Sequence, residues 1–430
     1  MNRYPTIKII DLVNSGEANL QTGPFGTQLK ASDYVEDGTP VINVRNVGFG
    51  DIRAENLEYL DEPMVEKLSA HLLKKGDIVF GRKGAVERHA FIGGIGEGWI
   101  QGSDCLRLRI SSERINNRFV SYYFKTQSHQ DWMQALCSFG ATMASLNQDI
   151  VKLITLPFPP KEIQDKVAAI LSSYDDLIEK NKSRIELLEK MAEEIYREWF
   201  VRFRFPGHQT AEFKKGIPNK WVVKKIVDVE GFRFIPRNLN DFDGIKNYYA
   251  TSELQGINLL NPTEKITFSS KPSRAQYIPT LYSVWFARMK NTYKVLGVNS
   301  INKKLIVDAV LSSGFAGFDT EKKYFAFLYS TIKSSSFHDS IDMFSSGATQ
   351  ESLTNSGLQQ VKILLPDDTT MIAFGDVVNP IIDEIFQLQK FNKSLSANTG
   401  LLLNRLISGK LSLEGINIKF PSTMQNDEAA

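Results

Sequence analysis

The sequence has few of the residues on which disulfide-rich and membrane proteins depend. It contains only two cysteines, Cys105 and Cys137, which excludes a disulfide framework and indicates ordinary thiols in a reducing compartment. No apolar run approaches the ~18 residues that cross a bilayer, and no N-terminal segment has the pattern of a signal peptide. We therefore expect a soluble, cytoplasmic protein without membrane contact.

Catalytic and cofactor motifs are also missing. No Gly-x-x-x-x-Gly-Lys-Ser/Thr loop for nucleotide phosphates occurs, and Gly93–Gly98 lacks the spacing of a dinucleotide-binding loop. The five histidines are scattered without the spacing of metal ligands. Leu156–Pro160 (LPFPP) lacks the asparagine of the adenine methyltransferase tetrapeptide and better marks a helix start. These absences argue against an enzyme and against a metal site.

Positive charge is unevenly distributed along a chain whose net charge is only +2. Lysine and arginine exceed aspartate and glutamate by 11 in residues 201–304 and by 6 in residues 67–125, whereas the remaining blocks are acidic or nearly neutral. Two separate basic zones suit contact with phosphate groups at two places. Ordinary solvated surface is the alternative for each zone.

The strongest pattern in the sequence is an internal repeat. Two segments, Ser138–Pro157 and Ser345–Pro366, are called the repeated segments below. A period near 207 residues predicts a duplicated domain, because it is far too long for a solenoid. The matches are Gly140-Ala141-Thr142 with Gly347-Ala348-Thr349, Ser145-Leu146 with Ser352-Leu353, Val79–Gly84 with Trp285–Lys290, Arg118–Phe124 with Tyr324–Ser330, and Lys8–Leu12 with Lys225–Val229.

Each copy ends in a long stretch with the apolar spacing of a coiled coil. Steps alternating between four and three residues over about five heptads predict a seam, and chain order makes antiparallel pairing of the two helices the simplest arrangement. Asn181 and Asn392 interrupt the seams. They either fix the register of the two helices or stay partly hydrated without an effect on stability. The seams are Val167, Leu171, Tyr174, Ile178, Asn181, Ile185, Leu188, Ala192, Ile195 and Trp199, and Phe374, Val378, Ile381, Ile385, Leu388, Asn392, Leu395, Thr399, Leu402 and Leu406.

The parts of the chain that precede these helices show short alternating strands separated by Gly, Pro, Asn and Asp. We predict an α+β fold in which two similar α/β globes are separated by two long antiparallel helices that form a coiled-coil rod, with a pseudo-twofold internal repeat. The expected boundaries are a first globe at 1–159, a first helix at 160–200, a second globe at 201–366, a second helix at 367–410 and a tail at 411–430.

Three segments resemble the specificity subunits of type I restriction-modification systems. Leu156–Gly207 is similar to their central conserved region, while Gly23–Val47 and Ile217–Val229 are similar to the starts of their two target recognition domains. The resemblance implies that 1–159 and 201–366 are target recognition domains, and that 160–200 and 367–410 are the conserved helices. Each domain would recognise one half of a bipartite DNA site, and the helices would set the spacer between the halves.

The resemblance also implies partners and cofactors. This non-catalytic chain would bind double-stranded DNA and scaffold two modification (methyltransferase) subunits and the restriction (translocase and endonuclease) subunits. S-adenosylmethionine, ATP and Mg²⁺ would be bound by those partners and not by this chain. Two other functions stay open: a coiled-coil scaffold whose globes bind protein, and a stand-alone DNA-modifying enzyme, which the missing motifs disfavour.

Candidate DNA-contacting residues follow from the chemistry of base edges, which are read by Arg, Lys, Asn or Gln on loops that enter the major groove. Arg82 and Arg288 are the strongest candidates, because the repeat places them at equivalent positions after a predicted strand. Phosphate contact or plain surface is the alternative for each. The candidates are Arg45, Asn46, Arg82, Lys83, Arg88 and His89 in the first globe, and Arg233, Arg237, Asn238, Arg288, Lys290, Asn291 and Lys294 in the second.

Overall fold

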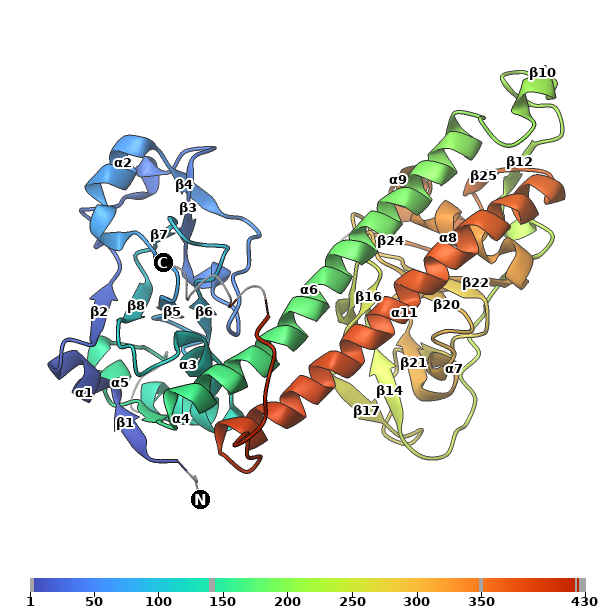
Figure 1. The fold of residues 1–430 in the computed structure, drawn as a ribbon. Helices are drawn as coiled ribbons and strands as arrows, with labels where there is room; N and C mark the ends of the chain where they lie inside the picture. The colour runs from blue at the N-terminus through green and yellow to red at the C-terminus, as the bar shows by residue number, and fades with distance from the viewer. Residues whose placement is uncertain (1–3, 139–143, 348–350, 422–423, 425–430) are drawn as a thin grey trace. The chain divides into compact units, whose positions relative to one another are not determined.

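The computed structural model describes residues 4–138, 144–347, 351–421 and 424. The chain divides into two compact units: unit 1 comprises Met1–Leu177 and Leu395–Ala430, and unit 2 comprises Ile178–Ser394. Each unit contains a globular part and portions of two long helices, α6 (Lys161–Tyr196) and α11 (Asp368–Ile407) (Figure 1). Of the repeated motif, Gly140-Ala141-Thr142 and Ala348-Thr349 lie outside the described residues.

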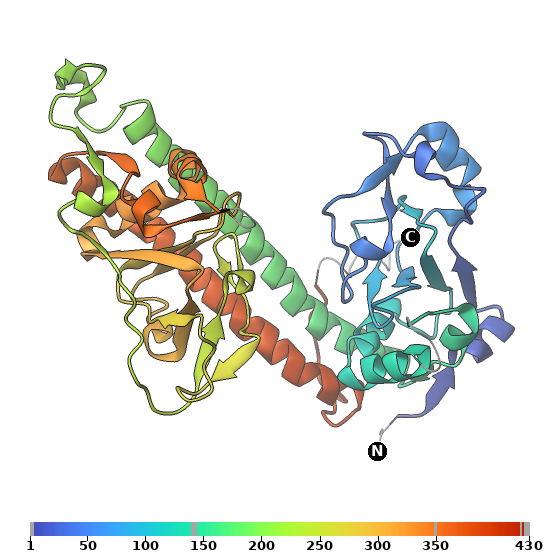
Figure 2. The ribbon, with the colours of Figure 1, turned by 180° about the vertical axis from the view of Figure 1, so that it is seen from behind.

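Unit 1 is built around an antiparallel four-stranded sheet with the order β2-β8-β5-β6. Because successive side chains on a strand point to opposite faces, Ile78 and Phe80 pack on the helices while Val79 faces the other way. The short helices α3, α4 and α5 lie together beside this sheet (Figure 2). The strands are β2 (Ala18–Thr22), β5 (Ile78–Gly81), β6 (His89–Phe91) and β8 (Cys105–Ile110); the helices are α1 (Ile9–Asn14), α2 (Glu62–Lys67), α3 (Asn117–Phe124), α4 (Gln127–Ser138) and α5 (Gln148–Lys152).

A second, smaller sheet covers the other face of the first. Its central strand β3 (Thr39–Ile42) pairs antiparallel with β4 (Glu58–Leu60) and parallel with β7 (Ile100–Gln101). A separate antiparallel pair joins β1 (Thr6–Lys8), near the start of the unit, to β9 (Thr155–Pro157), just before α6.

Unit 2 repeats the topology of both sheets of unit 1, which confirms the predicted duplication. The sheet β13-β22-β19-β20 has the order of β2-β8-β5-β6, and β14 pairs antiparallel with β17 and parallel with β21, as β3 does with β4 and β7. An additional strand, β18 (Ala275–Tyr277), extends the second sheet; at the corresponding edge of unit 1, Leu72 makes a single bridge with Ile100.

The remaining strands and helices of unit 2 are short. The strands are β10 (Phe213–Lys214), β11 (Ile217–Pro218), β12 (Val222–Lys225), β13 (Phe232–Phe234), β14 (Lys246–Tyr249), β15 (Leu254–Gln255), β16 (Asn258–Leu259), β17 (Glu264–Ile266), β19 (Ser283–Ala287), β20 (Val295–Val298), β21 (Ala309–Ser312), β22 (Phe315–Thr320), β23 (Ser345–Ser346), β24 (Ser352–Leu353) and β25 (Lys362–Leu365). The helices are α7 (Lys304–Asp308), α8 (Lys322–Lys333), α9 (Ser335–Met343) and α10 (Asn355–Leu358).

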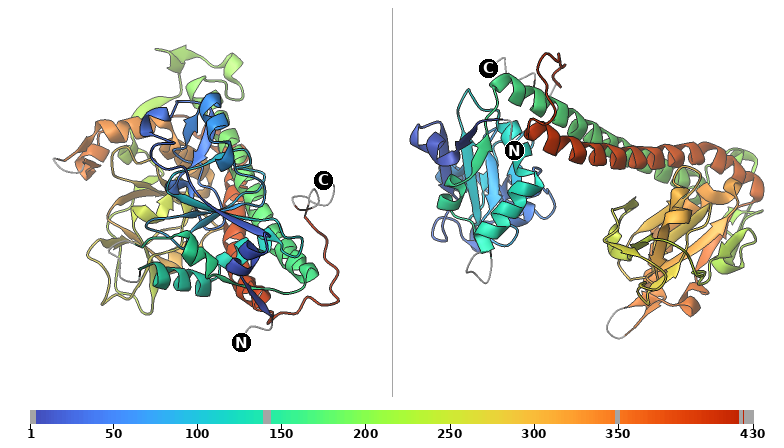
Figure 3. Two further views of the ribbon diagram at one scale, coloured as in Figure 1. Left: turned by 90° about the vertical axis from the view of Figure 1, so that its left-hand side faces the viewer. Right: turned by 90° about the horizontal axis from the view of Figure 1, so that it is seen from below.

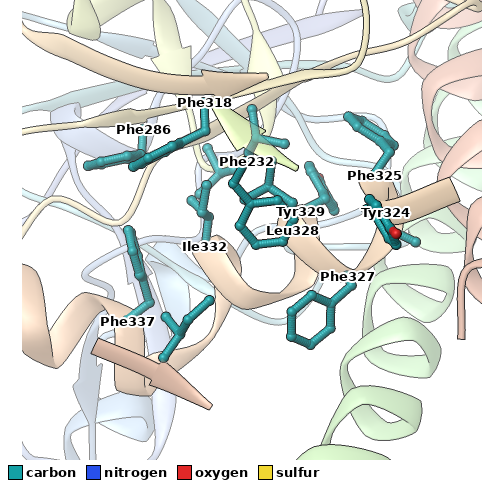
Figure 4. Packing of buried hydrophobic residues seen from close by; sticks show 14 of the residues in the cluster. Phe232, Phe286, Phe318, Tyr324, Phe325, Phe327, Leu328, Tyr329, Ile332 and Phe337 are labelled. Carbon is teal, nitrogen blue, oxygen red and sulfur yellow. The ribbon is translucent and has the colours of Figure 1, made fainter. Parts of the chain in front are cut away.

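The core of unit 2 is rich in aromatic rings. Helix α8 is apolar around most of its circumference, and this pattern suits a helix that is covered on several sides. Its residues Phe325 and Phe327 are almost fully buried. Figure 4 shows side chains of α8 packed with Phe232, Phe286 and Phe318, which come from the four-stranded sheet. Each large ring that is buried in this position removes about 150–250 Å² of surface from water.

Helices α6 and α11 run antiparallel in unit 2, where contacts between them define their register. In unit 2 the Asn181 side-chain amide donates to Asn392 Oδ1 at 2.8 Å, and Arg184 forms an ion pair with Glu384 at 3.0 Å. Figure 3 shows the helices side by side along one side of this unit. None of the predicted seam positions is exposed. The asparagines therefore meet as the seam requires, and their role in fixing the register stays a prediction.

Two further features concern the helices. A π-helical turn at Arg197–Val201 follows α6, and all but its last residue lie within the predicted first helix at 160–200. Within the described part of the chain, no helix combines the length and the apolar character needed to cross a membrane.

Candidate nucleic-acid interface

Loops gather at one end of the strands in unit 1, and their surface is called the turn face of unit 1. Backbone hydrogen bonds hold these loops together: His89 N–H donates to the carbonyl of Gly48 at 3.1 Å, and Arg82 N–H donates to that of Asp104 at 2.9 Å. The loops comprise residues 23–29, 43–57, 82–88, 102–104 and 144–147.

Unit 2 has an equivalent turn face at the corresponding strand ends. Arg288 N–H donates to the carbonyl of Gly314 at 2.9 Å, and Ser313 N–H donates to that of Arg274 at 2.7 Å. The turn at Ser313-Gly314 therefore lies between these two arginines. The loops comprise residues 250–258, 271–275, 287–294, 312–315 and 351–354.

The repeated segments are tied to both turn faces by the two equivalent arginines. Leu146 N–H donates to the carbonyl of Arg82 at 2.8 Å, and Leu353 N–H donates to that of Arg288 at 2.8 Å. The guanidinium groups donate to the same two residues. Arg82 Nε donates to the carbonyl of Leu146 at 3.4 Å, and Arg288 Nη1 donates to that of Leu353 at 3.0 Å. The described part of the repeat therefore recurs because the same clamp is built twice.

This clamp changes the interpretation of the two strongest candidates. Arg288 also donates from Nε to the carbonyl of Phe315 at 2.9 Å, so its guanidinium group is already directed at backbone acceptors. Equivalence in the repeat correctly indicates a shared role for Arg82 and Arg288. Arg288 holds the loops through two bonds, whereas Arg82 makes one bond of 3.4 Å, and base contact by either residue stays a prediction.

Substitution of Arg288 by alanine is expected to destabilise unit 2 by about 3 kcal/mol, because two buried carbonyl oxygens lose a charged donor. The measurement is urea-induced unfolding followed by circular dichroism. Arg274→Ala is the matched control, since this exposed side chain makes no such bonds and a change within about 0.5 kcal/mol is expected. Equal stability of the two variants would contradict the clamp.

Two other candidates are buried. Asn46 is fully enclosed, and its side-chain amide donates to the carbonyls of Arg53 and Glu55 at 2.9 and 3.1 Å. His89 is 1 % exposed with Nε2 2.8 Å from Ser121 Oγ, and burial holds the pKa of its imidazole well below the usual value. Neither side chain is accessible to DNA in this structure, because each serves the packing beneath the turn face.

Three candidates take part in exposed ion pairs. Arg45 contacts Glu58 at 2.9 Å and Lys83 contacts Asp104 at 3.2 Å in unit 1, while Lys290 contacts Glu351 at 2.5 Å in unit 2. Exposed pairs of this kind contribute only about 0–1 kcal/mol. A phosphate group could replace the carboxylate at small cost, so these three cations remain eligible for DNA contact.

The other candidates differ in their position. Lys294 donates to the carbonyl of Thr251 at 2.7 Å, and the exposed Asn291 sits in the left-handed region with φ 56°. Both belong to the turn face of unit 2. Arg233 instead forms an ion pair with Asp319 at 2.8 Å, at the opposite end of the same sheet.

The last three candidates have distinct surroundings. Asn238 holds the backbone of Ile278 through two hydrogen bonds of 2.9 and 2.8 Å, so its amide is structural. Arg237 is exposed and makes no hydrogen bond or ion pair among the described residues. The guanidinium carbon of Arg88 lies 5.4 Å from the centre of the Phe49 ring, at the turn face of unit 1.

Sequence patterns missed two exposed side chains of the turn faces. Phe25 is 64 % exposed in unit 1. It lies on a loop that is closed by a hydrogen bond of 2.7 Å from Gln28 N–H to the carbonyl oxygen of Phe25. Arg274 is exposed in unit 2 and lies outside the repeated motifs, so no internal match pointed to it. Among the residues that the structure describes, no group of three or more His, Cys, Asp or Glu side chains could hold a metal ion.

Among known proteins, the relatives that match most of this chain carry similar descriptions. Residues 29–190 match the family model described as type I restriction modification DNA specificity domain. The chain is 25 % identical over 403 residues to the type I restriction enzyme MjaIX specificity subunit of Methanocaldococcus jannaschii, covering 87 % of this chain and 90 % of the relative. It is 19 % identical over 438 residues to the HindI specificity subunit of Haemophilus influenzae, covering 86 % and 94 %.

A solved structure shares the fold. The crystal structure of the type I restriction-modification system S subunit from M. genitalium aligns with a TM-score of 0.57 at 14 % identity, covering 94 % of this chain and 96 % of that one. At this identity the likeness concerns the arrangement of helices and strands, including the duplicated globular part.

Proposed function

Because this chain belongs to the specificity subunits of type I restriction-modification systems, we propose that its turn faces read the two halves of a bipartite DNA site. The observation that carries the proposal is one sheet topology built twice with different exposed side chains at equivalent ends. A duplicated scaffold supports two reading surfaces, and divergence of the loops lets each surface recognise its own bases.

Specificity subunits are the non-catalytic, DNA-recognition components of these systems, and they work in a complex with modification and restriction subunits. We propose that two modification subunits bind this chain and supply adenine methylation with S-adenosylmethionine. Restriction subunits would supply ATP- and Mg²⁺-dependent translocation and cleavage. Helices α6 and α11 would set the number of unread base pairs between the two half-sites.

Contact with phosphates predicts strongly salt-dependent DNA binding. The affinity of the purified chain for duplex DNA is expected to fall as salt rises, with a slope of log K against log salt of about −0.9 for each phosphate contacted. Exposed cations such as Arg45, Lys83 and Lys290 are the side chains expected to contribute. Fluorescence anisotropy with labelled duplexes over a salt series measures this slope.

The same experiment tests the alternative of a scaffold whose globes bind only protein. A chain that binds no duplex at low salt, while its fold is intact by circular dichroism, would contradict DNA reading. The enzyme alternative has its own control, since the chain alone is expected to transfer no methyl group from S-adenosylmethionine to DNA. Methylation that followed this chain through purification would overturn the non-catalytic assignment.

A further inference from the structure

The basic side chains of the turn face of unit 2 are not equally available. Arg288 is directed at backbone carbonyls, Lys290 is paired with Glu351, and Lys294 donates to a carbonyl oxygen. Arg274 is exposed and has neither a hydrogen bond from its side chain nor an ion pair within the described residues. Of these four cations, it alone keeps its donors free for a ligand.

The backbone beneath Arg274 is held firmly although its side chain is free. Its carbonyl accepts from Ser313 N–H at 2.7 Å, and Ala275 N–H donates to the carbonyl of Pro272 at 2.9 Å. Ala275 is 2 % exposed and pairs with Ser312 in the sheet. The strand end is therefore fixed, and on binding only the Arg274 side chain has to be ordered, at a cost of about 2 kcal/mol.

Arg274 also lies where the two units differ. It immediately precedes β18, the strand that unit 2 adds at an edge where unit 1 has only the bridge between Leu72 and Ile100. Two readers of different half-sites share their scaffold and must differ where they touch bases. The free guanidinium group therefore stands at a point of divergence and outside the duplicated clamp.

Building on the proposed function, we propose that Arg274 reads a guanine in the half-site bound by unit 2. A guanidinium group presents paired N–H donors, and guanine is the base whose major-groove edge carries two adjacent acceptors, O6 and N7. The planar fork of arginine fits both acceptors at once, whereas a lysine ammonium acts as a point charge. One G·C pair of one half-site would therefore depend on Arg274.

The test uses the full chain in its complex with the modification subunits and a panel of labelled duplexes. The duplexes carry the bipartite site defined by the methylation pattern of the parent, with each base pair of both half-sites replaced in turn. Binding is measured by anisotropy at one fixed salt concentration for the parent, R274A, R274K and K303A. Lys303 is the matched control, because it is exposed and lies at the opposite strand ends of unit 2.

The parent is expected to discriminate about 5- to 150-fold in favour of G·C at one position of one half-site. R274A should lose that discrimination and keep every other preference. R274K should keep most of the affinity with weaker discrimination, and K303A should behave as the parent does. Should R274A prove unfolded by circular dichroism, R274K decides by the same criterion.

Two results would overturn the assignment. The first is unchanged discrimination at every position in both Arg274 variants. The second is a uniform loss of affinity for all sequences, which would make Arg274 a phosphate contact. Failure of the proposed function is distinguishable from both, because the parent itself would then show no sequence preference.

Discussion

Lowering the pH from about 7.5 to about 5 is expected to reduce the stability of unit 1 by about 2 kcal/mol through His129 alone. Burial lowers the pKa of this imidazole from 6.5 to about 3. The ring is 2 % exposed and stacks on Phe124 with centroids 4.6 Å apart. The folded state therefore keeps His129 neutral at a pH where the unfolded chain binds a proton.

The direction of this effect follows from linkage. The stabilising contribution is complete above the unfolded pKa of 6.5, and it is lost as the pH falls from there towards the folded pKa of about 3. The lowered pKa values of His71 and His89 add losses of the same sign in unit 1, and that of His338 adds one in unit 2. Acid destabilisation should therefore begin well above the range in which carboxylates are protonated.

The measurement compares urea unfolding of the parent and His129→Phe at both pH values. Phenylalanine keeps an aromatic ring next to Phe124 and removes one titrating group. The variant should lose about 2 kcal/mol less than the parent on acidification, while the remaining histidines titrate in both proteins. An identical loss in parent and variant would contradict the low pKa of His129.

Substitution of Gly23 by alanine is expected to cost about 3 kcal/mol and to disorganise the turn face of unit 1. A Cβ atom at this position would lie 1.9 Å from the carbonyl oxygen of Gly102. Gly102 is equally confined, because its own Cβ would lie 2.3 Å from Asn43 Oδ1. At Gly23 the new Cβ would overlap a backbone atom of Gly102, so the movement of a side chain cannot relieve the overlap.

The control for this prediction lies three residues further along the same loop. A Cβ added to Gly26 would meet no atom within 4 Å, and Gly26 does not adopt a positive φ. Gly26→Ala should therefore leave unfolding unchanged within about 0.5 kcal/mol. In DNA binding, G23A should weaken recognition of one half-site only. Normal stability of G23A would contradict this prediction, because it would show that the segments containing Gly23 and Gly102 can move apart at no cost.

Large parts of the fold could be predicted from the sequence. Alternating steps of four and three residues correctly predict a set of side chains of α6 and α11 that are not exposed, because periodicity reports on the face that packs. The internal matches correctly predict a duplicated globular part. The strand β18 escaped prediction, since three residues pairing at a sheet edge leave no periodic signal.

The candidate interface was harder to predict, because residue type does not reveal what a side chain already bonds. Arg82 and Arg288 occupy equivalent positions as expected, yet their guanidinium groups bind carbonyl oxygens of their own chain. Asn46 has a side chain suited to base contact, but its amide is buried and donates to the carbonyls of Arg53 and Glu55 in its own loop. Arg274 has no counterpart in the repeat, and only the structure shows that it is unpaired.

One chain is expected to read a split DNA site with two copies of one scaffold. Methylome sequencing of cells with and without this chain tests it most directly. A methylated-adenine motif in two specific parts, separated by a fixed number of unspecified bases, should be present with the chain and absent without it. A motif that persists in its absence, or a single uninterrupted motif that depends on it, would contradict the account.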